Sequence, residues 1–296
     1  MLGLSEAALG ASCALASALT WTLSGLLVRR LQDRFSSLAL SALRSILGGG
    51  LLLGGLLVTT GPAGLAAVSP GALVLLTASI VLAVIVGDTV FFESTRSLGL
   101  ARAMTISMSY PVASALLAAA VLGEPITPAI AAGSLLTLGG LALIVLSRDG
   151  AEVRPERYWP GVRGATLASL AWAVSVILLR APLREMDALD AQAIRLPLAG
   201  LLLCAMPRVW DAADTLRRAP PGVLVTVLLL GGLSAVSSIL FVVGVKHAGV
   251  AVATVLSAAS PMFALPLGML VLGERPRAAA VLGTAVTVAG VVVLQL

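Results

Sequence analysis

Charged residues are scarce in this chain. Only 11% of its 296 residues are Asp, Glu, Lys or Arg, whereas 59% are hydrophobic and the mean hydropathy is +1.07. An average soluble domain carries about 25% charged residues, and a soluble protein of this length could not cover its surface with so few. The composition therefore predicts an all-α integral membrane protein that has the lipid bilayer as a partner.

Lysine, histidine and cysteine are nearly absent. Lys246 is the only lysine, so the net charge of +5 comes almost wholly from arginine. In a membrane protein such a balance reports topology rather than binding to nucleic acid. His247 is the only histidine, and Cys13 and Cys204 both fall in apolar runs. We therefore expect no metal site, no other cofactor, no disulfide and no enzymatic activity. Residues 1–10 contain no basic stretch, so we expect no cleaved signal peptide.

Long uncharged runs divide the chain into ten expected spanning helices, five in each half. About 20 apolar residues cross a bilayer, and runs of this length alternate here with short polar or Gly-Pro breaks. The runs of the first half lie at about 7–28, 37–58, 73–96, 101–122 and 128–146. Residues 148–163 form the most polar stretch. We expect it to link a first domain, residues 1–150, to a second, residues 151–296.

The second half repeats the marks of the first half in the same order. After 151 residues, the first-half residues Trp21, Ser24, Arg29 and Arg44 return as Trp172, Ser175, Arg180 and Arg195. After 150 residues, Phe91, Gly99, Pro111 and Glu124 return as Phe241, Gly249, Pro261 and Glu274. Five helices are an odd number, so the second half enters the membrane from the opposite side. Inverted repeats of this kind are typical of secondary transporters, whose substrate site lies near the midplane between the halves.

Basic residues are distributed unevenly between the two sides of the predicted helices. The side that holds the loop after the first helix carries fourteen: Arg29, Arg30, Arg34, Arg96, Arg102, Arg148, Arg154, Arg157, Arg163, Arg208, Arg217, Arg218, Arg275 and Arg277. The other side carries three: Arg180, Arg184 and Lys246. Cytoplasmic loops are enriched in Lys and Arg. We therefore expect the first side to face the cytoplasm of a bacterial-type inner (plasma) membrane and both termini to lie on the non-cytoplasmic side.

The order of these marks resembles the drug/metabolite transporter superfamily, and within it the EamA-type carriers. The marks that carry the resemblance are Phe91-Phe92, Leu122-Gly123-Glu124-Pro125, Trp172 and Leu272-Gly273-Glu274-Arg275. The resemblance implies a cavity lined by both halves and substrates that are small polar or amphipathic metabolites, with amino-acid exporters as one branch. It also implies that Pro111 and Pro261 match the family's helix prolines, and that Trp21 and Trp172 match its cavity-side aromatics.

Charges inside the expected membrane are the sharpest site candidates. Arg44 and Asp88 lie at a similar depth, about 12 Å from the cytoplasmic end of their helices, and a charge at the bilayer centre costs about 2.5–3.5 kcal/mol. We expect Arg44 to pair with Asp88, or with Glu93, near the cytoplasmic mouth. The pair either locks two helices together or serves a gate or the substrate. Arg195 has no acid at its level, so it either extends to the opposite membrane surface or offers a cation to a substrate carboxylate.

Aromatic and hydroxyl side chains complete the expected cavity. Its lining is predicted to contain Trp21, Ser24, Asp88, Phe91, Ser107, Tyr110, Trp172, Ser175, Phe241 and Ser257. The aromatics could equally belong to the core or the interfacial belt, and the serines could serve close helix packing. Pro111 and Pro261 are predicted to bend their helices, as hinges or as static shape. Gly50 and Gly54 look like a close-packing face.

A secondary transporter is the function that these features favour. We expect a monomer that exports small metabolites, amino acids foremost, by alternating access through a central cavity between the repeats. The alternatives within transport are import and the export of drug-like cations. A membrane scaffold would not explain an inverted repeat. An intramembrane enzyme would need clustered catalytic groups that the expected helix cores lack.

Overall fold

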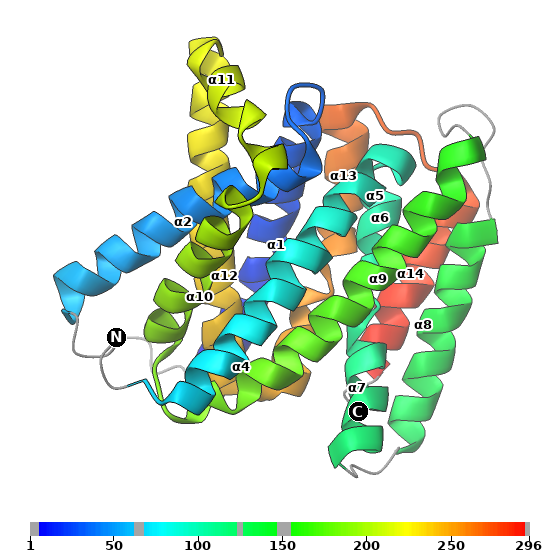
Figure 1. Ribbon diagram of the computed structural model, residues 1–296. Helices are drawn as coiled ribbons and strands as arrows, with labels where there is room; N and C mark the ends of the chain where they lie inside the picture. The colour runs from blue at the N-terminus through cyan, green and yellow to red at the C-terminus, as the bar shows by residue number, and fades with distance from the viewer. Residues whose placement is uncertain (1–5, 62–67, 123–126, 147–154, 294–296) are drawn as a thin grey trace.

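The computed structural model describes residues 6–61, 68–122, 127–146 and 155–293, and within these ranges the chain forms helices and no strand (Figure 1). The elements of the first half are α1 (Glu6–Leu31), α2 (Ser37–Thr59), α4 (Pro70–Ile80), the π-helix η1 (Val81–Asp88), α5 (Thr89–Leu98), α6 (Leu100–Ser107), α7 (Tyr110–Leu122) and α8 (Pro128–Leu146). Those of the second half are α9 (Pro155–Arg180), η2 (Pro182–Arg184), α10 (Ala188–Cys204), η3 (Pro207–Val209), α11 (Asp211–Arg217), α12 (Pro221–Ser257), α13 (Ser260–Leu272) and α14 (Ala278–Val293).

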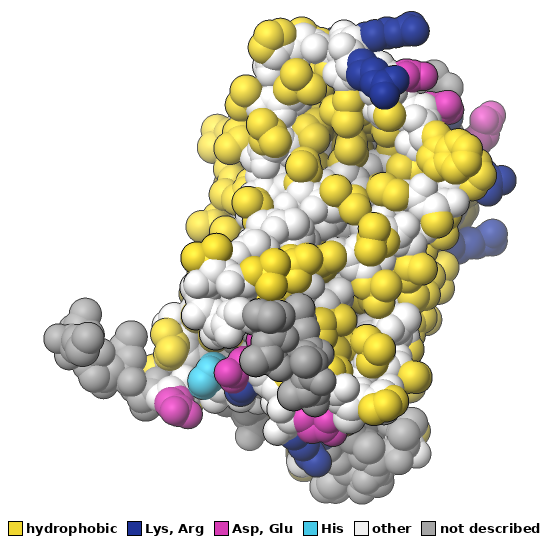
Figure 2. All heavy atoms as spheres, turned by 60° about the vertical axis from the view of Figure 1, so that its left-hand side comes forward, with side chains coloured by type: hydrophobic (Ala, Val, Ile, Leu, Met, Phe, Trp, Pro, Cys, Tyr) yellow, Lys and Arg dark blue, Asp and Glu magenta, His cyan; other side chains and the backbone are white. Residues whose placement is uncertain are grey.

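Several of these helices are long and apolar enough to cross a membrane. By length and composition, six spans qualify among the described residues: Glu6–Leu31, Ser37–Thr59, Pro70–Leu98, Glu156–Arg184, Pro221–Val250 and Val252–Leu272. A seventh is added if Ala188–Cys204 and Pro207–Arg217, bent by 92°, form one span. The all-helical membrane class is thus confirmed, whereas the count of ten spans stays a prediction. Figure 2 shows hydrophobic side chains over much of the face between two ends where most charges in that view gather.

The pair α2 and α10 shows how the two halves meet. A Cβ atom on Gly49 would lie 2.5 Å from the Pro197 backbone nitrogen, and one on Gly200 would lie 2.9 Å from the Ile46 nitrogen. Because Gly49 corresponds to Gly200 and Ile46 to Pro197 in the repeat, these are one contact seen from each half. Residue numbers rise along one helix as they fall along the other, so these equivalent helices run antiparallel.

The pair α8 and α14 repeats this arrangement. A Cβ atom on Gly140 would lie 2.5 Å from the Thr287 nitrogen, and one on Gly290 would lie 2.4 Å from the Thr137 nitrogen. Gly140 and Gly290 are repeat equivalents, as are Thr137 and Thr287, and here too the helices are antiparallel. Only glycine allows backbones to approach this closely.

The packing face predicted for α2 is wrong, because the observed face lies one or two residues earlier in the helix. A Cβ atom on Gly50 or Gly54 would meet nothing within 4 Å, whereas Gly48 and Gly49 pack against the second half. The glycine spacing alone does not say which side of a uniformly apolar helix faces protein.

The remaining large contacts exchange partners between the halves. Helix α1 lies along the first part of α12, where Gly10 meets Ala248 and Gly244 meets Ala14. Helix α9 lies in the same way along α4, η1 and α5. A helix that opens one half therefore packs on the third span of the other half (Figure 1).

Both halves break their helices at equivalent points. Gly99 has φ 83° and Gly249 has φ 84°, a left-handed conformation that favours glycine, and each ends one helical stretch and begins the next. Further breaks at residues 108–109 and 258–259 separate α6 from α7 and α12 from α13. Pro111 and Pro261 each follow such a break. They do not bend a continuous helix as expected. They sit in the first turn of a new helix, where a missing N–H costs little.

Candidate functional site

A cavity of about 150 Å³ lies between the two halves. Seven of the ten side chains predicted to line it do so: Trp21, Asp88, Tyr110, Trp172, Ser175, Phe241 and Ser257. The predicted charges Arg44 and Arg195 also reach it.

The first charge cluster joins Arg44 to Asp88, so the predicted ion pair is present. The guanidinium also donates to Ser234 Oγ (3.3 Å), and Trp172 Nε1 donates to Asp88 Oδ1 (3.0 Å). The Arg44 guanidinium lies 5.2 Å from the Trp21 ring centroid, within the range of a cation–π contact. Arg44 is 3% exposed and Asp88 is 4% exposed. Each oxygen of the carboxylate is therefore held by its own donor, and the pair is neutral overall.

A π-helix positions this cluster. Along η1 the carbonyl of Ala83 accepts from Trp172 Nε1 (3.1 Å), so one indole N–H is shared between Ala83 and Asp88. A Cβ atom on Gly87 would lie 2.5 Å from the same nitrogen, which means that the indole lies directly on the backbone of η1. Single π-turns within α-helices occur frequently at functional sites. The wide turn sets the depth at which Asp88 meets its partners.

The second charge cluster surrounds Arg195, which is 5% exposed. Its Nη1 donates to Gln192 Oε1 (2.8 Å), and its Nη2 donates to Ser79 Oγ (2.9 Å) and Ser175 Oγ (3.4 Å). Ser175 Oγ in turn donates to the Ser79 carbonyl (2.8 Å), so its hydroxyl offers a lone pair to the guanidinium. Arg195 forms no ion pair within the described parts of the chain. The expectation that it extends to the membrane surface is wrong, because these polar groups hold it inside.

A hydroxyl contact closes another wall of the cavity and links the halves. Tyr110, at the start of α7, shares a hydrogen bond of 2.5 Å with Ser257 Oγ and donates to the Thr254 carbonyl (3.1 Å). Both partners lie in the last turn of α12, directly before the break at 258–259. Tyr110 thus ties the two helix breaks together.

Three predicted lining residues lie elsewhere. Ser24 and Ser107 are buried and donate back to their own helices, to the carbonyls of Thr20 (2.9 Å) and Ala103 (2.7 Å). Phe91 is fully buried behind the cavity wall, with its ring 5.8 Å from that of Trp21 and 5.5 Å from that of Trp172.

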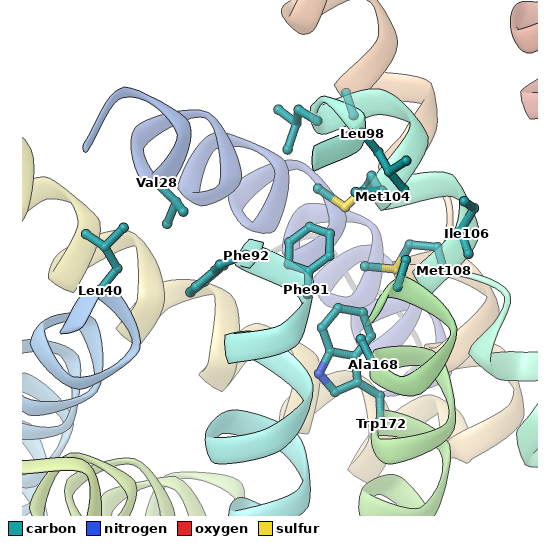
Figure 3. Packing of buried hydrophobic residues seen from close by; sticks show 14 of the residues in the cluster. Val28, Leu40, Phe91, Phe92, Leu98, Met104, Ile106, Met108, Ala168 and Trp172 are labelled. Carbon is teal, nitrogen blue, oxygen red and sulfur yellow. The ribbon is translucent and has the colours of Figure 1, made fainter. Parts of the chain in front are cut away.

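Figure 3 shows the Phe91 and Trp172 rings against each other, with Phe92 directed toward Val28 and Leu40. Trp172 therefore has one side in a packed aromatic cluster and also reaches the cavity. The cluster fixes the indole that holds Asp88.

The alternative partner for Arg44 is also excluded. The Glu93 side chain is 59% exposed, accepts from Ser37 Oγ (2.9 Å) and lies 3.7 Å from Arg96. It is a surface group and not part of the buried charge cluster.

Several lining residues were not predicted from the sequence. They are polar or sulfur-containing side chains: Ser17, Met108, Gln192, Ser234 and Ser237. Two signals were available. Gln192 precedes Arg195 by three residues, one helical turn, and the serines at 234, 237 and 238 follow a helical spacing along α12.

Glu274, in the Gly-Glu motif of the second half, contacts the first half. Its carboxylate accepts from the backbone N–H groups of Leu100 (2.6 Å) and Ala101 (3.3 Å), at the first turn of α6. The second half thereby caps a helix of the first half. Its repeat counterpart, Glu124, lies outside the described residues.

The chain was compared with known families and structures. The family model described as "EamA-like transporter family" matches residues 8–146 and matches again at residues 159–296. No curated protein matches the chain. One matching solved structure, titled "Crystal structure of protein", is 20% identical, with a TM-score of 0.69 over 96% of this chain and 94% of that chain. At this identity the likeness shows a shared fold.

Proposed function

The chain belongs to the EamA-like transporter family, and from that premise we propose that it exports small metabolites, amino acids foremost, by alternating access. It is a multi-pass membrane protein of a family of transporters of small solutes. The observation that carries the proposal is the cavity between the halves, where a carboxylate, two guanidiniums and several hydroxyls are gathered among apolar walls. Polar groups are expensive inside a membrane and mark solute pathways.

The proposed architecture is ten spans in two inverted repeats of five. The reciprocal contacts of Gly49 with Pro197 and of Gly200 with Ile46 support it, as do those of Gly140 and Gly290. Equivalent helices that run antiparallel are what a rotation axis in the membrane plane produces. We propose that one copy of the chain forms a complete transporter, since both repeats are present in it.

The proposed mechanism is a rocking of one half against the other. The helix breaks before Pro111 and Pro261 supply equivalent hinges, one in each half. At one end of the molecule the carboxylate of Glu274 holds the first turn of α6. When that end opens, either these hydrogen bonds break or Glu274 and α6 move together. Small-amplitude rearrangement at such breaks exposes a fixed central site to each side in turn.

The size and charge of the cavity favour small metabolites over drug-like cations. Its volume of about 150 Å³ is below the ~300–1,000 Å³ of typical pockets for drug-sized ligands. Its lining carries one carboxylate, which Arg44 already neutralises. A permanent cation would therefore meet a net positive wall. Catalysis is not favoured either, because that single carboxylate has no histidine or cysteine beside it in the lining.

The proposed orientation places the basic end in the cytoplasm of an inner membrane of the bacterial type. Arg96 donates to the Phe35 carbonyl and Glu274 caps Leu100, which brings the basic loops after the first and third spans and before α14 to one end. At the opposite end Lys246 pairs with Asp187. In the proposed orientation, a reporter fused after residue 296 should show its activity outside the cytoplasm and none inside. Activity in the cytoplasm would show that the orientation is the opposite one.

Flux through reconstituted protein tests the proposal. Proteoliposomes loaded with unlabelled amino acid should accumulate labelled leucine in saturable exchange. Asp88→Asn and Trp172→Ala should reduce the rate, because both alter the buried cluster at the cavity. Thr166→Ala, on an exposed face of α9, is the matched control and should leave the rate unchanged. No saturable flux of any metabolite, with folded protein, would favour a scaffold role.

A further inference from the structure

The charges that reach the cavity do not balance. Arg44 is neutralised by Asp88, whereas the partners of Arg195 within residues 6–61, 68–122, 127–146 and 155–293 are the neutral groups of Gln192, Ser79 and Ser175. The lining therefore carries a net charge of about +1. A buried charge without a partner is costly, and proteins normally pair it.

The unused hydrogen-bonding capacity of the lining is one-sided. Three buried side-chain atoms in the cavity-lining residues have no hydrogen-bond partner among the described residues: Trp21 Nε1, Arg44 Nε and Arg195 Nε. All three are donors that cannot accept. Three of the five N–H groups of Arg195 are used, and the other two are the buried Nε–H and one N–H of Nη1. A group that satisfies this wall must bring acceptors.

Apart from its hydroxyl groups, the rest of the lining is largely apolar, and the space is small. Ile80, Val84, Val176, Leu179 and Leu196 share the cavity with the aromatic rings. A solute of about 150 Å³ would bury an apolar chain against these side chains while a polar head faces the guanidinium. Arginine donates strong, charge-assisted hydrogen bonds to carboxylate oxygens.

We propose that Arg195 binds the carboxylate of the transported solute, so that the cavity selects compact amphipathic carboxylic acids by that group. This inference rests on the transport function proposed above. The carboxylate is the required head group, and an amino group on the solute is not. Amino acids with apolar side chains are then one subset of the substrates, beside the corresponding acids without an amino group.

Three probes with one branched skeleton separate the head groups. Leucine carries carboxylate and ammonium, 4-methylpentanoate carries the carboxylate alone, and 3-methylbutylamine carries the ammonium alone. Binding is read from the intrinsic fluorescence of the purified protein, because Trp21 and Trp172 line the cavity. Both carboxylates should bind. The affinity for the amine should be lower by about ten-fold or more, which is the scale of a lost hydrogen bond to a charged group.

Two variants remove the unpaired charge in different ways. Arg195→Gln deletes it, and Ser238→Asp places a carboxylate at the repeat counterpart of Asp88, where it should neutralise Arg195. Both should weaken carboxylate binding about ten-fold or more, and Arg195→Lys should restore part of it. The thermal midpoint of each variant shows that it is folded. Ser238→Asp is the safeguard if Arg195→Gln does not fold.

The outcomes separate this inference from the transport proposal. Flux that continues in Arg195→Gln with the same preference among the three probes overturns the anchor and leaves transport intact. Arg195-dependent binding without flux supports the anchor and contradicts transport. Equal binding of acid and amine, or no binding of either carboxylate by the folded wild-type protein, also overturns the anchor.

Discussion

Arg44 and Arg195 hold equivalent positions in the two repeats, but their surroundings differ. The first is joined to Asp88, whereas the second is held by neutral groups, and Ser238 stands at the counterpart of that acid. Since both halves adopt the same arrangement of helices, the fold does not require the acid. An unpaired buried cation costs stability. A buried cation without a counter-charge in only one of the two halves is the pattern expected of a site that binds an anionic partner.

Deleting each guanidinium in turn should give the largest difference in stability between the two positions. Arg44→Met leaves Asp88 buried without a cation and should lower the free energy of unfolding by about 3–5 kcal/mol. Arg195→Met leaves no charge behind and should change it little, or raise it. Thermal unfolding of the two purified variants in one detergent measures the difference. Equal losses would show that Arg195 is as fully paired as Arg44.

Moving the acid from one repeat to the other tests the comparison of Arg44 with Arg195 more finely. Asp88→Ser strands Arg44, and adding Ser238→Asp gives Arg195 a partner. Because each acid would pair with its own guanidinium, Ser238→Asp should raise the free energy of unfolding by about 1–3 kcal/mol, and by a similar amount in the wild-type and the Asp88→Ser background. Unfolding of both single variants and the double variant measures this gain. No gain in either background would mean that an acid at 238 does not reach Arg195.

A smaller perturbation should loosen the paired side alone. Gly87→Ala places a methyl group 2.5 Å from Trp172 Nε1, so the indole must move away from Asp88. Overpacking of this kind costs about 1–3 kcal/mol. The matched control is Gly50→Ala, whose Cβ meets nothing within 4 Å and which should be neutral or gain up to about 1 kcal/mol from helix propensity. A neutral Gly87→Ala would show that the indole is not fixed on η1.

The ion pair of Asp187 and Lys246 lies at the surface, in contrast to the buried pair of Arg44 and Asp88. Its removal should have the smallest effect on stability. The hydrogen bond and charge of Lys246 lower the pKa of Asp187. Its stabilisation should be present above about pH 4, the ordinary pKa of Asp, and should be lost as the pH falls through the lowered value. Asp187→Asn should cost less than about 1 kcal/mol at neutral pH. Unfolding measured across this pH range checks the sign, and a gain in stability toward low pH would contradict it.

The sequence was sufficient for the features that depend on composition and depth. The membrane class follows from the scarcity of charge, and the pairing of Arg44 with Asp88 follows from two opposite charges at one depth on neighbouring helices. The equivalence of Gly99 and Gly249 followed from the repeat and is matched by their φ angles. Each of these needs only distance along the chain.

The features that the sequence did not predict depend on which face of a helix meets which neighbour. Ser24 and Ser175 are repeat equivalents, yet only Ser175 lies at the cavity, because its partner Ser79 has no match in the other half. Two partners of Arg195, Ser79 and Ser175, come from α4 and α9, so no local pattern shows them. The π-helix is likewise invisible, because it replaces one hydrogen-bonding pattern with another in an apolar run.

Access to a single cavity residue from each side of the membrane tests the central claim, that one cavity between the halves carries the solute. With Cys13 and Cys204 replaced by serine, Ser237→Cys gives one thiol in the cavity lining. A membrane-impermeant thiol reagent should label it when applied to either face, and leucine should slow both reactions. Labelling from one face alone under every condition, or from neither, would contradict alternating access.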